Sequence, residues 1–132
     1  MNLKPEERRE LINHRMSRAR ETEREAVLLH KNDMHAVAMS RIYYSMFHAL
    51  SAMALFHGYQ SSKHSGLISW FNKTFVKTGI IDARYSKILT RSFEKRMDSD
   101  YDDFVEFADE EVKSMLEECS DFISLMEQMT ES

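Results

Sequence analysis

Arg41 and His48 are two side chains whose types and spacing could do chemistry on a phosphate group. On a helix, seven positions make about 700° of rotation, so these side chains lie about 20° apart on one face and about 10.5 Å apart along it. A neutral imidazole can take a proton from a hydroxyl group, and a guanidinium can bind phosphate oxygens through two N–H groups. The pair is too widely spaced to share one proton, but the two groups could hold one phosphodiester.

Other polar residues could extend such a site. Tyr44 comes three residues after Arg41 and four before His48, so on a helix it shares their face. Its ring could stack on a base, and its hydroxyl could donate to a phosphate. Lys63 and His64 come directly before a predicted helix, whose free N–H groups favour anions. These residues could therefore add to an anion-binding site.

Each of these residues also has a structural interpretation. Arg41 could form an ion pair with Asp98 or Asp100, and His48 could form a hydrogen bond inside a helix bundle. His64 could cap or pack against the first turn of its helix. Taken alone, the structural interpretation of Arg41 and His48 is favoured, because pairs of polar residues on helices are common.

The elements that must position these residues are helices. The 132 residues include only three Gly and one Pro, too few for the tight turns of a meandering sheet. Apolar spacing and stop signals predict helices from Pro5 to about His30, from Met34 to the stop at Gly58, from Ser62 to the stop at Gly79, from about Ala83 to Met97, and from Asp109 through Met126. The predicted fold is all-α, an antiparallel four-to-five-helix up-and-down bundle that forms one domain over residues 1–132.

The second predicted helix is apolar almost all the way round. Such a helix is either the central helix of the bundle or buries its second side against another subunit. The chain also carries its charge unevenly, because residues 61–97 have a net charge of +6 and residues 98–132 a net charge of −12, within a total of −4. Ordinary solvated helix surfaces are the favoured interpretation, although a basic face could steer a polyanion.

Composition also predicts the compartment and argues against metal chemistry. Cys119 is the only cysteine, the first six residues lack the apolar stretch of a signal peptide, and the longest apolar run, Ala52–Phe56, is far shorter than the roughly 20 residues that span a bilayer. We therefore expect a cytoplasmic protein without membrane contact. Paired Glu-x-x-His motifs and Gly-rich phosphate loops are absent, so we expect no metal and no cofactor.

Five segments in order resemble a compact prokaryotic family of HEPN proteins (higher eukaryotes and prokaryotes nucleotide-binding). They are Ser40–Ala49, Lys63–Ile68, Phe75–Gly79, Arg91–Arg96 and Asp100–Asp102, and the resemblance covers residues from about 20 to 125. It implies a four-to-five-helix bundle, a homodimer, and a gene partner that is a minimal nucleotidyltransferase antitoxin. It also implies a metal-independent endoribonuclease whose motif is Arg, four to six residues, then His, with sites formed across the dimer.

The resemblance makes Arg41 and His48 the predicted catalytic pair, since six residues separate them. The predicted substrate-binding residues are Tyr44, Lys63, His64 and Arg96, and the predicted substrate is RNA. For Arg96, a salt bridge that ties its helix to the following acidic segment is the favoured alternative to RNA contact. The rival function is a non-catalytic interaction module that binds a nucleotidyltransferase partner or a nucleotide.

Overall fold

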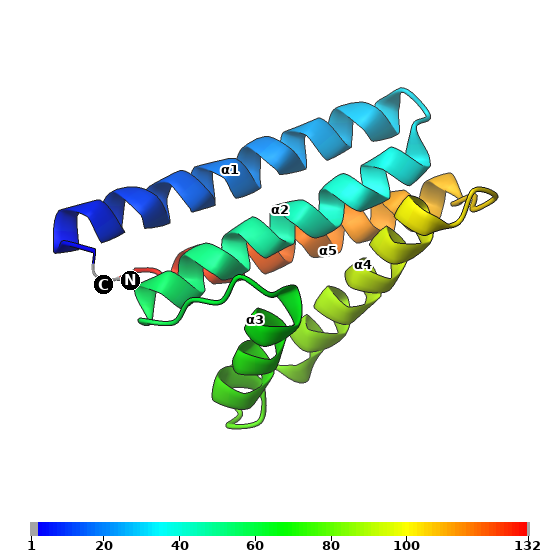
Figure 1. Cartoon of the computed structure of the whole chain (residues 1–132). Coiled ribbons are helices and arrows are strands. Elements are labelled where there is room, and N and C mark those ends of the chain that lie inside the picture. The colour runs from blue at the N-terminus through cyan, green and yellow to red at the C-terminus, as the bar shows by residue number, and fades with distance from the viewer. Residues whose placement is uncertain (1–2, 132) are drawn as a thin grey trace.

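The computed structural model describes residues 3–131, which form helices and no β-strand (Figure 1). The elements are α1 (Pro5–Lys31), α2 (His35–Phe56), α3 (His64–Phe71), the π-helical turn η1 (Asn72–Val76), α4 (Ala83–Tyr101) and α5 (Asp109–Gln128). The prediction of an all-α helix bundle is confirmed. Residues 1 and 132, the two ends of the predicted domain, lie outside the described residues.

Local sequence explains where the helices begin and end. Pro5 is the first residue of α1, where its missing N–H costs no hydrogen bond. The Asp82 carboxylate caps α4 by accepting a hydrogen bond from the backbone N–H of Arg84 at 2.8 Å. Gly79, which follows η1, has a φ of +78°, a conformation that favours glycine. Pro5 therefore marks the start of α1, and Gly79 and Asp82 mark the turn that separates η1 from α4.

The structure extends α4 beyond its predicted end at Met97. The helix continues to Tyr101, across the acidic residues that were expected to interrupt it. Within this extension, Arg96 Nε lies 3.0 Å from Asp100 Oδ2, an i,i+4 ion pair that supports one more helical turn. A carboxylate that suggested a helix end from sequence therefore stabilises the helix instead.

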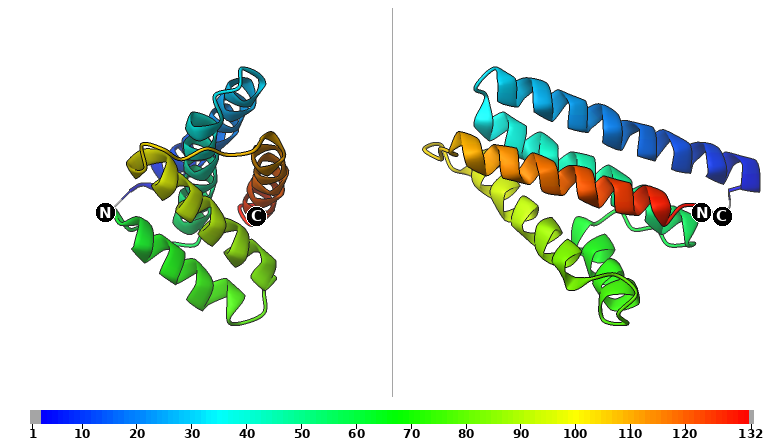
Figure 2. Two further views of the ribbon diagram at one scale, coloured as in Figure 1. Left: turned by 90° about the vertical axis from the view of Figure 1, so that its right-hand side faces the viewer. Right: turned by 180° about the vertical axis from the view of Figure 1, so that it is seen from behind.

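Helix α2 is the central element of the bundle. It packs against α1, α5, α4 and α3, and more of its residues are buried than in any other helix described. Figure 2 shows α5 running alongside α2, and α4 crossing both at a steep angle. The first of the two alternatives for an apolar helix, the central position, is therefore confirmed.

One stripe of α2 is not covered by the other helices. We call it the open face of α2, and its members, spaced three or four residues apart and all exposed or half-buried, are Val37, Ser40, Arg41, Tyr44, Phe47, His48 and Ser51. Contacts from Arg41 reach α1, whereas contacts from Tyr44 and Phe47 reach α4 and α3. The open face therefore has an α1 flank and an α3/α4 flank. None of the helices within residues 3–131 is both long and apolar enough to cross a membrane.

Candidate active site

The α1 flank of the open face carries the two residues of the predicted catalytic pair. Arg41 Nη2 donates a hydrogen bond to Glu25 Oε1 of α1 at 2.7 Å, and the side chains of the two residues are 34% and 44% exposed. An ion pair this exposed contributes little stability, about 0–1 kcal/mol. A phosphate group could replace the Glu25 carboxylate without a large cost. The alternative partners considered for Arg41, Asp98 and Asp100, are not the ones it contacts.

His48 is half-buried on the same face and is surrounded by positive charge. Burial lowers the pKa of its imidazole, and the positive charges of Arg18, Arg41, Arg15 and His14 lower this pKa further. The ring therefore stays neutral to a lower pH than an ordinary histidine. The rings of His30, His57 and His64 are each hydrogen-bonded, whereas those of His14, His35 and His48 have no hydrogen-bond partner within residues 3–131. A neutral, unpartnered imidazole beside several cations has the properties of a general base for an anionic substrate.

The α3/α4 flank has a different character, because its polar groups are already engaged. Arg96 Nη2 donates to the Tyr44 hydroxyl at 2.6 Å, and the guanidinium lies over the rings of Tyr43 and Tyr44. With its Asp100 ion pair, the Arg96 side chain is only 15% exposed. The salt bridge that was the favoured alternative for Arg96 is therefore present. Its use in substrate binding stays a prediction.

His64 is fixed on the same flank by stacking and by a hydrogen bond. Its ring stacks on Phe47 with a centroid distance of 3.9 Å, and its Nδ1 lies 2.8 Å from the Tyr43 hydroxyl. Tyr43 is fully buried, and burial raises the pKa of its phenol. Burial, and then the charge of Arg96, lower the pKa of His64. Two neutral rings joined in this way favour the packing interpretation of His64 over direct contact with substrate.

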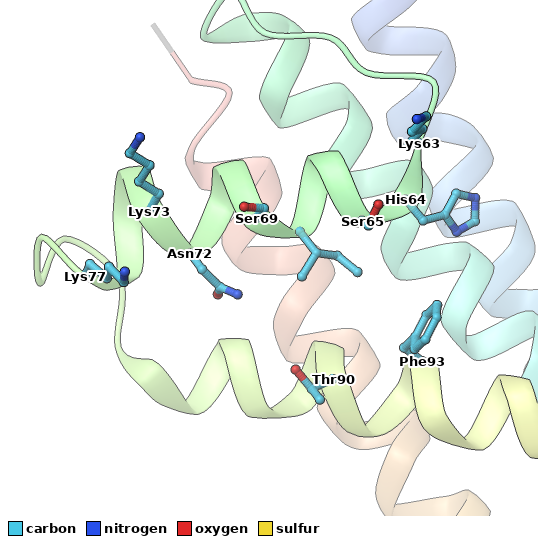
Figure 3. Close-up of a pocket in the computed structure, with 10 residues that line it drawn as sticks. Lys63, His64, Ser65, Ser69, Asn72, Lys73, Lys77, Thr90 and Phe93 are labelled. Atoms are coloured by element: carbon cyan, nitrogen blue, oxygen red, sulfur yellow. The ribbon is translucent and has the colours of Figure 1, made fainter.

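A groove with a volume of about 940 Å³ runs between α3 with η1 and the facing side of α4 (Figure 3). Lys63 and His64 lie at one end of it, and Lys73 and Lys77 lie at the other. Ile68 and Phe93 supply apolar surface, and the remaining lining residues described are Ser65, Ser69, Asn72 and Thr90. The lining contains no acid among the described residues. A groove with lysines at both ends and an aromatic ring in its wall suits a single nucleic-acid strand.

The groove lysines differ from most basic residues of α4, which form ion pairs. On α4, Arg84, Arg91 and Lys95 each pair with an acid of α5. The strongly basic stretch 61–97 is therefore largely neutralised where α4 meets α5. Four basic residues of this stretch form no ion pair with any residue from 3 to 131; Lys63, Lys73 and Lys77 line the groove, and Lys87 is exposed elsewhere on α4.

The structure thus places the six predicted site residues in two groups and one separate position. Arg41 and His48 share the α1 flank, Tyr44, His64 and Arg96 lie together on the α3/α4 flank, and Lys63 stands at the groove. The sequence analysis missed the residues that surround them, namely Arg15, Arg18, Tyr43, Lys73 and Lys77. Their positive charge and aromatic type were visible, but their proximity to the site depends on the packing of α1 and α3 against α2.

Comparison with known proteins now assigns the family. The family model of the HEPN domain matches residues 12–129, nearly the whole chain. The protein belongs to the HEPN family. A "UPF0332 protein" of Thermotoga maritima is 39% identical to this HEPN chain over 95% of each sequence. The family assignment made from five short segments is therefore confirmed.

Two further relatives come from Methanocaldococcus jannaschii, and both bear the name "Putative toxin". One is 34% identical over 67% of this HEPN chain and 60% of its own length. The other is 36% identical over 58% of this chain and 57% of its own length. These relatives are similar to the chain over a shared part, which spans less than two thirds of each of them.

Proposed function

We propose that this HEPN protein is a toxin-like, metal-independent endoribonuclease whose catalytic residues are Arg41 and His48. The observation that carries the proposal is the state of His48, a neutral imidazole without a hydrogen-bond partner in residues 3–131, set among Arg15, Arg18 and Arg41. A structural histidine in a bundle is normally hydrogen-bonded when half-buried. The names of the two Methanocaldococcus jannaschii relatives support a toxin-like role.

The proposed reaction is an attack by a ribose 2′-oxygen on the neighbouring phosphorus. His48 takes the 2′-hydroxyl proton, a bond forms between the 2′-oxygen and phosphorus, and the bond from phosphorus to the 5′-oxygen breaks. The products are a 2′,3′-cyclic phosphate and a 5′-hydroxyl, whose oxygen takes a proton from solvent or from the protonated His48. Arg41 binds the phosphate oxygens and stabilises the charge that develops on them, and this chemistry requires no metal ion.

The Glu25 carboxylate holds Arg41 in the absence of RNA. An entering phosphate would take over the guanidinium, because both ligands are anionic oxygens and the pair is partly exposed to solvent. Glu25 therefore keeps Arg41 extended on the open face rather than removing it from the site. This exchange is the reason that an occupied Arg41 is compatible with catalysis.

We also propose that a second copy of the chain packs beside the open face of α2, so that two catalytic pairs border one groove. Large apolar side chains are exposed at the end of the bundle that holds the α1–α2 turn and the α4–α5 loop. They are Leu28, Met34, Val37, Met97, Tyr101 and Phe104, and Phe104 is 92% exposed. Exposed apolar clusters of this kind mark protein interfaces. A nucleotidyltransferase antitoxin remains the predicted partner of the resulting homodimer.

The rival proposal is a non-catalytic interaction module, in which Arg41 and His48 have no catalytic role. In such a module both residues would serve the fold or hold a partner, and neither would be needed for RNA cleavage. The ion pair between Arg41 and Glu25 is the observation that favours this rival. Cleavage assays separate the two proposals.

The test is cleavage of mixed cellular RNA by the purified full-length protein in excess chelator. We expect the wild type to cut RNA and to leave 2′,3′-cyclic phosphate and 5′-hydroxyl ends. His48→Ala and Arg41→Ala should each lower the rate by about 100-fold or more, the usual contribution of a positioned base or oxyanion partner.

Arg24→Ala is the matched control, because Arg24 is an exposed arginine of α1, the helix that carries Arg15 and Arg18, and has no part in the proposed site. It should leave the cleavage rate unchanged. If the wild type does not cut RNA, or if all variants cut it equally, the interaction module becomes the better account.

A further inference from the structure

Three metal-ligand side chains meet at the end of the bundle away from α3. His30 lies in the last turn of α1, His35 is the first residue of α2, and Asp109 is the first residue of α5. Their ligand atoms all lie within 4.8 Å of one another. His30 and His35 are separated by a tight turn, but Asp109 is far from them in sequence. Only the packing of α5 against the α1–α2 turn brings the three together.

The geometry points to a binding site for a divalent transition-metal ion of the zinc class, formed by His30 Nε2, His35 Nε2 and an Asp109 carboxylate oxygen. In a tetrahedral zinc site, bond lengths of about 2.0–2.1 Å place neighbouring ligand atoms about 3.3 Å apart. Asp109 Oδ1 lies 2.8 Å from His30 Nε2 and 3.7 Å from His35 Nε2, values on either side of that spacing. The two imidazole ligand atoms lie within 4.8 Å of each other, so they would move together by up to about 1.5 Å to complete three corners of the tetrahedron.

The environment of His35 leaves its Nε2 available to an ion. Its side chain is only 19% exposed, yet its Nδ1 is buried with no hydrogen-bond partner within residues 3–131. Its Nε2, at 3.7 Å from Asp109, is too far away for a hydrogen bond. His35 Nε2 therefore makes no hydrogen bond within residues 3–131 that an ion would have to replace, whereas the buried Nδ1 is the other ring nitrogen and would not bind the ion.

The chemistry of the three groups selects the ion. Imidazole nitrogens bind Zn²⁺, Ni²⁺ and Cu²⁺ well, whereas Mg²⁺ and Ca²⁺ prefer sites made of oxygen atoms. The side chain of Asp109 is 60% exposed, so an ion can enter from solvent and keep water as its fourth ligand. The bound ion would join the ends of three helices and stabilise the folded chain, since the unfolded chain does not hold the ligands together.

This site is separate from the proposed ribonuclease centre. None of its three ligands belongs to the open face of α2, and the proposed cleavage reaction uses no metal. The inference therefore stands or fails independently of the proposed function.

The test is a Zn²⁺ titration of full-length, tag-free protein after chelator treatment, followed by calorimetry and by thermal unfolding. We expect one Zn²⁺ bound per chain and, at about 100 times the dissociation constant, a rise in Tm of roughly 5–10 °C. Co²⁺ in place of Zn²⁺ should give the intense visible absorption of a four-coordinate site.

Two variants and one control decide the result. His35→Ala removes a ligand without breaking the hydrogen bond between His30 and Asp109, and Asp109→Asn removes the anionic ligand but keeps an oxygen that can accept from His30. Both should lose the Tm rise and the Co²⁺ spectrum. His57→Gln, which alters a histidine at the other end of α2, should retain both. Absence of a Tm rise in the wild type, or an equal rise in all four proteins, would overturn the inference.

Discussion

The two flanks of the open face of α2 carry similar residue types but differ in how those residues are held. On the α1 flank, His48 has no hydrogen-bond partner in the described residues, and Arg41 has only a half-exposed ion pair with Glu25. On the α3/α4 flank, Arg96 contacts Tyr44 and Asp100, and His64 is bonded to Tyr43. An arginine and a histidine therefore occur on both flanks, but only one flank leaves them available to a ligand.

The two flanks of the one helix α2 therefore differ in role: polar side chains on the α3/α4 flank hold the fold together, and those on the α1 flank remain available to a ligand. Side chains around Arg96 are engaged, because Arg96 Nη2 donates to Tyr44, its Nε faces the Asp100 carboxylate, and His64 is bonded to Tyr43, and such contacts rigidify a core. The α1 flank instead places the positive charges of Arg15, Arg18 and Arg41 around a histidine whose pKa is lowered, an arrangement that is common at functional sites. We infer that the α3/α4 flank fixes the position of α2, and the α1 flank is the one that fits the proposed reaction.

The largest effect on the fold is expected from Arg96→Ala. The substitution leaves Asp100 without its ion-pair partner and removes the guanidinium from the rings of Tyr43 and Tyr44. We expect a loss of about 2 kcal/mol in the free energy of unfolding. Urea denaturation measures it, with Arg24→Ala as the control. A variant as stable as the wild type but unable to cut RNA would mean that Arg96 serves the reaction.

A smaller effect, on affinity, is expected from removal of the groove lysines. Lys73→Ala together with Lys77→Ala should weaken binding of a single-stranded RNA roughly tenfold at low salt and lower the slope of log affinity against log salt by about 1.4, two phosphate contacts at about 0.7 each. Filter binding at several salt concentrations measures both quantities. Lys113→Ala, on the acidic helix α5, is the matched control. If the slope is unchanged, the RNA strand does not follow this groove.

The smallest effect concerns pH and tests the electrostatics of the α1 flank. The base must be neutral to accept a proton, and the lowered pKa of His48 keeps it neutral below its ordinary value of about 6.5. In the pH profile of kcat/KM for the wild type, the midpoint of the fall on the acidic side should therefore lie below pH 6.5. In Arg18→Ala it should move to higher pH, because removing a positive charge makes the imidazolium easier to form. The rate profile of Arg24→Ala should match the wild type. A limb that stays in place in Arg18→Ala would show that this charge does not act on the base.

Much of the fold could be predicted because it depends on local signals. Gly58 and Gly79, both with positive φ, were recognised as stops, and the apolar character of α2 predicted its central position. The predicted end of α4 at Met97 was wrong because the acidic residues after it were taken to interrupt the helix. The ion pair between Arg96 and Asp100 instead forms within the helix and extends it. Acidic residues therefore do not by themselves indicate a helix end where a basic residue lies one helical turn before them.

The candidate site could be predicted only in part. Helical spacing and the family resemblance identified Arg41, Tyr44 and His48, since all three lie on one helix. Three of the cations around His48 come from α1, and the groove lysines come from η1 and from the residues directly before α3 and after η1, so only tertiary packing reveals them. For the same reason, spacing along the chain did not indicate the cluster of His30, His35 and Asp109.

The most direct test of the contrast between the flanks compares His48→Ala with His64→Ala, one histidine from each flank. For both variants we would measure the RNA cleavage rate per folded molecule and the Tm. The proposed difference between the flanks predicts that His48→Ala lowers the rate by about 100-fold or more with little change in Tm. It predicts that His64→Ala lowers the Tm by roughly 5 °C and changes the rate by less than about threefold. A His64→Ala variant that is stable but inactive, beside an active His48→Ala, would contradict it.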